Sequence, residues 1–483
     1  MDQMHYKSAT ELASLIRRKK VSALELLDHF LARVDKYNPK LNAIIWMDRD
    51  KARKRAKAAD AALKKGKRLG PLHGVPMTIK ESYQVAGSPT TWGLPAMKDN
   101  VTETTSVAAQ RMIDAGATLF GKTNVPVALA DHQSYNPIYG TTNNPWDVTR
   151  TPGGSSGGSA AALAAGLTGI DAGSDLGSSI RNPAHYCGIF GHKPTHGVVT
   201  FRGFALPGML TNPDIAVLGP LTRSATDLDL ALDIMAGPDP DDGGYSKIVL
   251  PKCEKAELNQ FRVAIKLSDP NCEVDGEYAD QIQILVDHLA KAGAKVSEAA
   301  PDLNTARVHD VFIQLMRAAV SMGTRDADIE DLKALAAGGD NDRFLQQSIA
   351  GLTMTYREWL KLDNERQHMR LKFNAFFKDY DILLCPVVAS AAFPHDHTEE
   401  GKRWRRRILV NGKEVPPTDQ SFWAGYAGLV YLPSTVGPAG LTRSGLPVGY
   451  QAITAQGKDK TSLAFAKLVE KDFGGFTPPP DYD

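Results

Sequence analysis

Three short segments carry side chains that could transfer an acyl group. The first ends at Lys80, the second is the glycine-rich loop Gly153–Ser159, and the third is Gly173–Pro183, which contains Ser179. A serine hydroxyl is a weak nucleophile and needs a nearby base. His73, the only histidine in these segments, precedes the strand that would deliver Lys80. A desolvated lysine is therefore the better candidate for the base.

Lys80 follows the apolar run Val75–Ile79, as expected of a lysine at the tip of a buried strand. Burial there would lower its pKa and leave a neutral amine that can accept a proton. By position alone, a surface lysine after a strand is the more common case. The residues by themselves leave both interpretations open.

Glycine is concentrated in one region of the chain. Of 42 glycines, 11 fall between Gly153 and Gly197, together with six serines. Glycine permits positive φ and close backbone approach, so the loop around Ser155 could cradle an anion or hold a serine in an unusual geometry. The alternative is a flexible linker, but a linker would not normally run directly into the small-residue helix predicted for 159–165.

Helices are predicted at the N-terminus. Ser8 and Ser22 are each followed three residues later by glutamate, which is the spacing of a capping box. The second apolar repeat is expected to stop at Asn38-Pro39, and the lysine- and arginine-rich segment 51–68 is expected to form an exposed helix.

Farther along, short apolar runs alternate with helical patterns, which is typical of an α/β protein. The expected strands are Val75–Ile79, Ala117–Phe120, 382–384 and Val448–Ile453, and the expected helices are 106–115, 281–292 and 365–377. Residues 393–418, with three prolines and a run of arginines, are expected to form a long surface excursion.

Three other patterns match known motifs in spacing, but their neighbouring residues do not predict the structure that each motif requires. Gly116–Thr123 has the spacing of a phosphate loop, but Gly116 closes a helix and strand-like residues lie inside the motif. Gly153–Gly157 has the GxSxG spacing of a nucleophile elbow, but the turn-rich residues 143–152 before it predict no buried strand. His395–His397 is more typical of a proline-flanked loop than of a metal site. We expect no metal and no cofactor.

Composition narrows the class of protein. The 483 residues carry 56 basic and 55 acidic side chains, a net charge of +1, which argues against nucleic acid as a partner. Four cysteines are too few for a disulfide scaffold and indicate a reducing compartment. No apolar run is long enough to span a bilayer, so we expect a cytoplasmic protein with no membrane contact.

The three segments together resemble the amidase signature family. Its hallmarks are GGSSGGS, then GSDxGGSIRxPA, after an upstream PLHGxPxxIKD-like segment, and the chain has counterparts of all three in that order. The resemblance spans about Ser8 to Ile453. It implies an α/β fold with a large mixed central sheet covered by helices on both faces. We expect a single domain over 1–483, with N-terminal helices at about 8–68, the signature core at about 70–235 and a C-terminal part at about 236–483.

The resemblance also implies roles for individual residues. Ser179 would be the nucleophile, Ser155 the bridging serine with a cis peptide before it, and Lys80 the base. The remaining predicted site residues would form the backbone oxyanion hole (Leu176, Gly177 and Ser178) or support the loops (Gly154, Asp175 and Arg181). Where the family usually has glycine this chain has Ser178, so the effect on the oxyanion turn is open.

These assignments predict an amidohydrolase that converts a carboxylic amide to an acid and an amine or ammonia. The same chemistry could serve a carbamate (urethane) or ester hydrolase, and a less favoured alternative is an amidotransferase component that acts on aminoacyl-tRNA. We expect a small-molecule substrate and a monomer or homodimer. Gln133, Tyr135, Trp423 and Tyr426 are candidates for the substrate pocket. The alternative is that these side chains pack the core.

Overall fold

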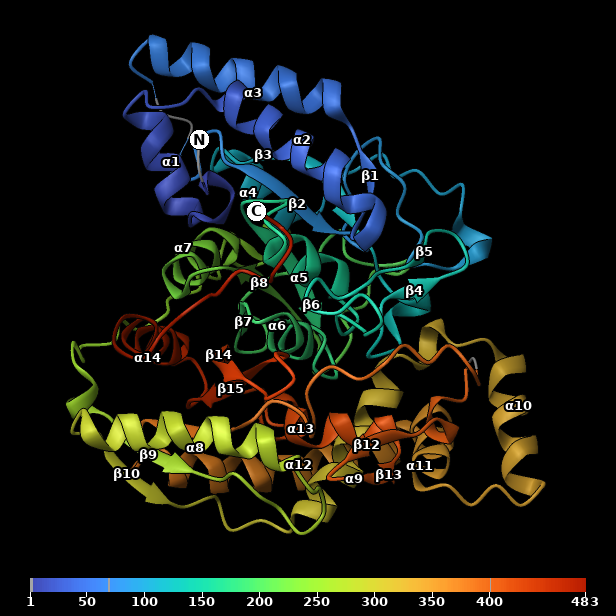
Figure 1. Cartoon of the computed structure of the whole chain (residues 1–483). Coiled ribbons are helices and arrows are strands. Elements are labelled where there is room, and N and C mark those ends of the chain that lie inside the picture. Colours follow the sequence, from blue (N-terminus) through green and yellow to red (C-terminus); the bar gives the residue numbers. More distant parts are fainter. Residues whose placement is uncertain (1–2, 68–69, 400) are drawn as a thin grey trace.

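The computed structural model describes residues 3–67, 70–399 and 401–483. Its main sheet has eight strands in the order β10-β9-β11-β15-β14-β7-β8-β6, and a second sheet has the order β1-β3-β2. β10, β9 and β11 are parallel, whereas β11, β15, β14, β7, β8 and β6 pair antiparallel along the rest of the main sheet. The chain is therefore an α/β protein built on a large mixed sheet, as the sequence predicted (Figure 1).

The first half of the chain supplies the second sheet and one end of the main sheet. Its elements are α1 (Ala9–Arg17), α2 (Ala23–Leu41), β1 (Ile44–Met47), α3 (Arg49–Lys64), β2 (Pro76–Lys80), α4 (Val107–Asp114), β3 (Thr118–Thr123), β4 (Tyr135–Asn136), β5 (Gly140–Thr141), α5 (Gly157–Ala164), β6 (Asp171–Asp175), α6 (Arg181–Cys187), β7 (Phe190–Lys193), β8 (Val217–Thr222) and α7 (Ala225–Met235).

The second half supplies the other end of the main sheet and most of its helical cover. Its elements are β9 (Arg262–Ile265), α8 (Gly276–Lys291), β10 (Lys295–Glu298), α9 (Thr305–Ala319), α10 (Asp326–Ala337), α11 (Arg343–Leu352), α12 (Tyr356–Phe376), β11 (Ile382–Pro386), β12 (Ile408–Val410), β13 (Lys413–Val415), α13 (Phe422–Gly428), β14 (Ser434–Leu441), β15 (Pro447–Ile453) and α14 (Asp459–Asp472).

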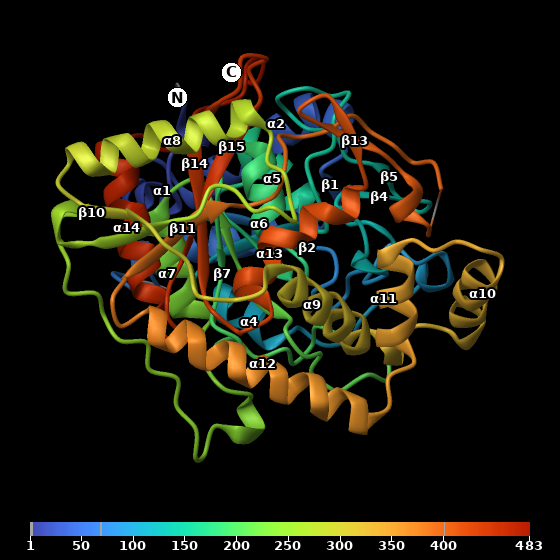
Figure 2. The same cartoon turned by 90° about the horizontal axis from the view of Figure 1, so that it is seen from below.

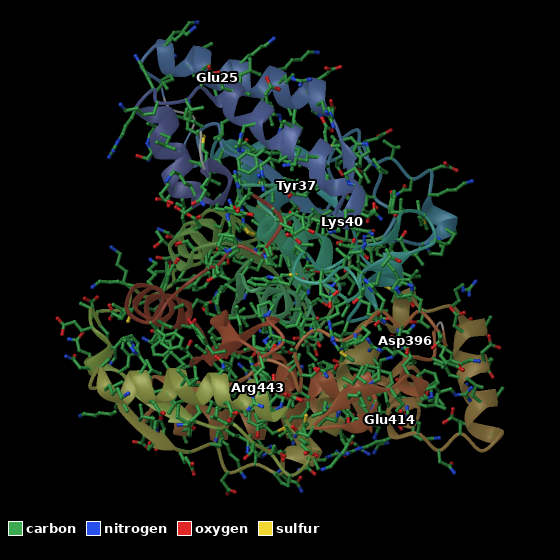
Figure 3. The ribbon with its side chains drawn as sticks, in the orientation of Figure 1. Glu25, Tyr37, Lys40, Asp396, Glu414 and Arg443 are labelled. Atoms are coloured by element: carbon green, nitrogen blue, oxygen red, sulfur yellow. The ribbon has the colours of Figure 1, made fainter. Side chains whose placement is uncertain are left out.

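Helices cover both faces of the main sheet, as α8 and α12 on opposite sides of its strands show (Figure 2). The buried strands and the apolar faces of these helices form two clusters of buried side chains, one drawn mainly from each half of the chain. Charged side chains such as Glu25, Glu414 and Arg443 lie on the outside (Figure 3).

Backbone hydrogen bonds join the two sheets at the segment that precedes β6. The N–H of Thr78 donates to the carbonyl of Ile170 at 3.3 Å, and the N–H of Gly169 donates to the carbonyl of Pro76 at 3.0 Å. β2 therefore runs alongside β6, so the side chains at their ends can meet. This junction supports one domain over residues 1–483, which stays a prediction.

The N-terminal predictions are confirmed except at two helix ends. Both capping boxes form, and α3 buries only an alanine stripe, Ala52, Ala56 and Ala59. This helix ends at Lys64, four residues before the predicted end, and residue 68 itself lies outside the described residues. The predicted stop at Asn38-Pro39 is wrong, because α2 continues to Leu41. Proline has a helical φ, so it can stand in a last turn.

The segment 393–418 is not simply a surface excursion. It contains the hairpin β12–β13, and the side chains of Trp404 and Arg406 are buried. Arg406 donates to Asp131 Oδ2 at 2.6 Å and to the Tyr135 hydroxyl at 2.7 Å. The guanidinium can be buried because it finds these partners, which lie far away in sequence.

Candidate active site

Lys80 is the last residue of β2, and its side chain is fully buried. Its Nζ donates to Ser155 Oγ at 2.6 Å and to Ser174 Oγ at 2.9 Å. Burial lowers the pKa of Lys80 to about 7, although the carboxylates of Asp175 and Asp171 raise it in part. Neutral amine is therefore abundant at neutral pH, and the interpretation of Lys80 as a surface residue is wrong.

Ser155 lies in a tight loop that only glycine neighbours permit. A Cβ added to Gly154 would lie 2.3 Å from the carbonyl oxygen of Asp131, closer than real side chains approach. The Gly154–Ser155 peptide is cis, as the family resemblance implied. The loop leads into α5 without a strand before it, so the prediction that GxSxG is not a nucleophile elbow here is confirmed.

Ser179 lies in the turn between β6 and α6. Its carbonyl accepts from the N–H of Ser156 at 3.2 Å, which fixes this turn against the loop that carries Ser155. Ser179 is partly exposed, whereas Lys80 and Ser155 are buried. The structure thus places Lys80 against Ser155 and leaves Ser179 within reach of solvent.

Asp175 holds the Ser179 turn together. Its carboxylate accepts from the backbone N–H groups of Ser178 and Ile180, both at 3.0 Å, and from two nitrogens of Arg181. Burial alone would raise the pKa of Asp175, but the Arg181 guanidinium and these donors hold it well below its usual range. The carboxylate is therefore ionised and braces the turn.

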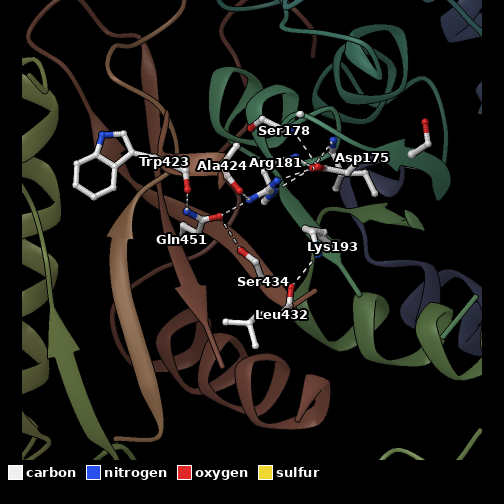
Figure 4. Close-up of polar contacts among 12 residues, drawn as sticks. Asp175, Ser178, Arg181, Lys193, Trp423, Ala424, Leu432, Ser434 and Gln451 are labelled. Carbon is white, nitrogen blue, oxygen red and sulfur yellow. Dashed lines mark hydrogen bonds and ion pairs between the residues drawn. The ribbon is translucent and has the colours of Figure 1, made fainter. Parts of the chain in front are cut away.

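Arg181 connects this turn to the C-terminal half of the chain. Its Nη1 donates to the carbonyl of Ala424 at 3.0 Å and to Gln451 Oε1 at 2.8 Å (Figure 4). Gln451 also donates to the carbonyl of Trp423. The buried Arg181 thus ties the turn to β15 and α13. Sequence reasoning gave Gln451 no role at the site, because this contact spans about 270 residues.

The predicted oxyanion residues differ in what their N–H groups do. Leu176 and Gly177 are partly exposed, and their N–H groups have no acceptor among the described residues. The N–H of Ser178 is already directed at Asp175. The carbonyl of Gly177 contacts His132 Nε2 at 3.1 Å, a partner that sequence reasoning missed. Two of the three predicted oxyanion residues therefore have an open N–H, and the N–H of Ser179 also has no acceptor among the described residues.

Two of the four candidate pocket residues have side-chain partners in the segment 396–397, and the other two are buried. Gln133 makes two hydrogen bonds with the backbone of Asp396, at 2.7 and 2.9 Å. Tyr135 stacks on His397 with ring centroids 3.9 Å apart. Trp423 is fully buried and Tyr426 is 3% exposed. Their burial favours the core-packing alternative for the two aromatic residues of α13.

One cavity lies away from these residues. It measures about 840 Å³ and lies against α10, and its lining includes Leu335, Asp340, Trp404 and Arg405. None of the predicted site residues lines it. The GKT of the rejected phosphate-loop motif lies within β3, in agreement with that rejection.

Comparison with known proteins gives consistent matches. A family model described as Amidase matches residues 25–463. The chain is 33% identical to an acylamidase of Rhodococcus erythropolis, over 97% of this chain and 95% of that protein. It is 32% identical to an indoleacetamide hydrolase of Bradyrhizobium diazoefficiens, over 97% and 86%. It is 30% identical to a component of the glutamyl-tRNA(Gln) amidotransferase of Gloeothece citriformis, over 92% and 93%.

Comparison with solved structures also finds an amidase. A bacterial aryl acylamidase of the amidase signature enzymes superposes with a TM-score of 0.81 and 25% identity, covering 99% of this chain and 98% of that chain. In the described part of this chain, no group of three or more His, Cys, Asp or Glu side chains could hold a metal ion. No helix among residues 3–67, 70–399 and 401–483 is long and apolar enough to cross a membrane.

Proposed function

This chain belongs to the amidase family of amide hydrolases, and we propose that it cleaves small carboxylic amides through a serine acyl-enzyme. In this proposal Ser179 is the nucleophile, Ser155 relays the proton and Lys80 is the base. The observation that carries it is the 2.6 Å contact between Lys80 Nζ and Ser155 Oγ, in a site where burial lowers the pKa of Lys80 to about 7.

Acylation proceeds by two linked proton transfers. Neutral Lys80 accepts the proton of Ser155 while Ser155 accepts that of Ser179, and Ser179 Oγ attacks the carbonyl carbon. The negative charge on the carbonyl oxygen is stabilised by the open N–H groups of Leu176 and Gly177. When the C–N bond breaks, the proton returns through Ser155 to the departing nitrogen.

Deacylation uses the same groups in reverse. A water molecule gives a proton through Ser155 to Lys80 as its oxygen attacks the acyl carbon, and this proton returns through Ser155 to Ser179 Oγ as the ester bond breaks. The partial exposure of Ser179 is consistent with water reaching it. The products are a carboxylic acid and an amine or ammonia.

Two other substrate classes use the same serine chemistry. A carbamate or an ester presents the same carbonyl to Ser179, and their turnover would identify a urethanase or an esterase. The amidotransferase alternative is favoured by the 30% identity to a component of such an enzyme. In that case the chain would require partner chains and an aminoacyl-tRNA substrate.

A matched substrate panel on the purified chain separates these functions. The amide, ester and carbamate should share one aryl leaving group and one acyl group, with Ser179→Ala as the control. We expect amide hydrolysis by the chain alone that is lost in the variant. Turnover confined to the ester or the carbamate would refute the proposed substrate class, and no turnover of any of the three would favour the amidotransferase function.

A further inference from the structure

Ser178 has a backbone conformation that residues other than glycine rarely adopt. Its φ is 96°, in the region where a Cβ is disfavoured. It stands between Gly177, whose N–H is open, and Ser179. Glycine at this position would remove the unfavourable Cβ, so the serine destabilises the turn unless its side chain has a function.

The Ser178 hydroxyl is a buried polar group with no partner. Ser178 is fully buried, and its Oγ has no hydrogen-bond partner among the described residues. Both backbone groups of Ser178 are engaged. Its N–H donates to Asp175 at 3.0 Å (Figure 4), and its carbonyl accepts from the N–H of Asn182 at 2.7 Å. Only the hydroxyl is left to bind another group, and a buried hydroxyl without a partner is costly.

The turn also has one backbone donor fewer than the sequence suggested. Three N–H groups were expected to face the oxyanion, but that of Ser178 is directed at Asp175. The ionised Asp175 also accepts from Ile180 and Arg181, so it holds the Ser178 N–H firmly in this arrangement. The side chain of Ser178 carries a second donor on the same residue.

We propose that the Ser178 hydroxyl is a catalytic hydrogen-bond donor that stabilises the oxyanion together with the N–H groups of Leu176 and Gly177. This assignment rests on the proposed acyl-enzyme at Ser179. The hydroxyl becomes hydrogen-bonded only when negative charge develops on the carbonyl oxygen, so it stabilises the transition state more than the bound substrate.

A proton-relay role fits Ser178 less well. Lys80 Nζ donates to Ser155 and Ser174, and no hydrogen bond joins it to Ser178 within the described part of the chain. Lys80 therefore has serine partners other than Ser178, and the donor role is the one left for the Ser178 hydroxyl.

Two substitutions separate the hydroxyl from the backbone. Ser178→Ala removes only Oγ, whereas Ser178→Gly also removes the Cβ that disfavours the observed φ. Removing one oxyanion donor lowers kcat by about 10²- to 10³-fold in other enzymes. Because the open N–H groups of Leu176, Gly177 and Ser179 remain here, we expect kcat to fall about 10- to 100-fold in both variants, with KM changed less than about twofold. Neither melting temperature should fall, and that of Ser178→Gly should rise.

Ser348 in α11 offers a matched control. It is 1% exposed, and its Oγ also lacks a hydrogen-bond partner among the residues described. Ser348→Ala therefore removes an equally buried, unpartnered hydroxyl from a helix that carries none of the predicted site residues. Its melting temperature should change as in Ser178→Ala, but its kcat should stay unchanged.

The affinity for a trifluoromethyl ketone is the readout that a purely structural role would not move. This inhibitor forms a hemiketal oxyanion with the serine nucleophile, so its affinity should weaken tenfold or more in Ser178→Ala and stay unchanged in Ser348→Ala. Unchanged inhibitor affinity or an unchanged kcat in Ser178→Ala would overturn the donor role. The acyl-enzyme at Ser179 is tested separately by fluorophosphonate labelling. Loss of labelling in Ser179→Ala supports it, and retained labelling contradicts it.

Discussion

Lys80 should control how the rate depends on pH. Burial lowers its pKa from 10.5 to about 7. At pH 7 a lysine with the ordinary pKa is neutral in roughly one molecule in 3,000, whereas about half of the Lys80 side chains are neutral. Only the neutral amine accepts a proton from Ser155, so activity is lost as the pH falls through the pKa of Lys80. The difference in pKa corresponds to roughly 5 kcal/mol in favour of the neutral form.

The assay is kcat/KM for an uncharged amide substrate between pH 5 and pH 9. We expect the rate to rise about tenfold per pH unit at low pH and to level off above a midpoint near 7. Lys80→Met should lower the rate by about 10²- to 10⁴-fold and abolish this acidic limb.

Lys122 provides the matched control. It is equally buried and burial lowers its pKa to about 7, but its Nζ donates to Pro89 and Thr90 instead of Ser155. Lys122→Met should therefore retain the acidic limb. A midpoint near 10, or a limb that survives in Lys80→Met, would refute the assignment of Lys80 as the base.

Three further predictions concern the scaffold. Asp175→Asn should lower kcat at least tenfold and destabilise the chain by about 3–5 kcal/mol, because it leaves a buried guanidinium unpaired; an unchanged denaturation midpoint would contradict this. Gly154→Ala should abolish activity, because its Cβ would clash with the Asp131 carbonyl, whereas Gly244→Ala, which meets nothing within 4 Å, should be active. Lys122 has a pKa of about 7 in the folded chain and an ordinary pKa of 10.5 in the unfolded chain, so its burial destabilises the fold less as the pH rises between these values. In urea, the free energy of unfolding of the wild type should therefore rise relative to that of Lys122→Met by up to about 1.4 kcal/mol per pH unit. Parallel pH profiles of the two proteins would refute this.

Local patterns predicted the elements that carry the site. The run before Lys80 forms β2, although the strand begins one residue later than expected and includes the lysine. The glycine-rich loop leads into α5, and the alternation of runs and helices is that of the observed α/β fold. These predictions depend on side-chain periodicity and on the backbone freedom of glycine, which are properties of neighbouring residues.

Contacts between distant segments could not be predicted in this way. Arg181 is held by Gln451 because of how the two halves of the chain pack. The burial of Arg406 likewise depends on Asp131, a partner from the first half. A sequence pattern shows which polar residues are available, but a partner far away in sequence decides whether they are satisfied.

Labelling with a fluorophosphonate probe tests the central claim most directly. The probe forms a covalent bond with an activated serine, and peptide mass spectrometry locates the modified residue. We expect one labelled site, Ser179, with labelling lost in Ser179→Ala and greatly slowed in Lys80→Met. A probe attached to another serine, or full labelling of Ser179→Ala, would contradict the Ser179–Ser155–Lys80 mechanism.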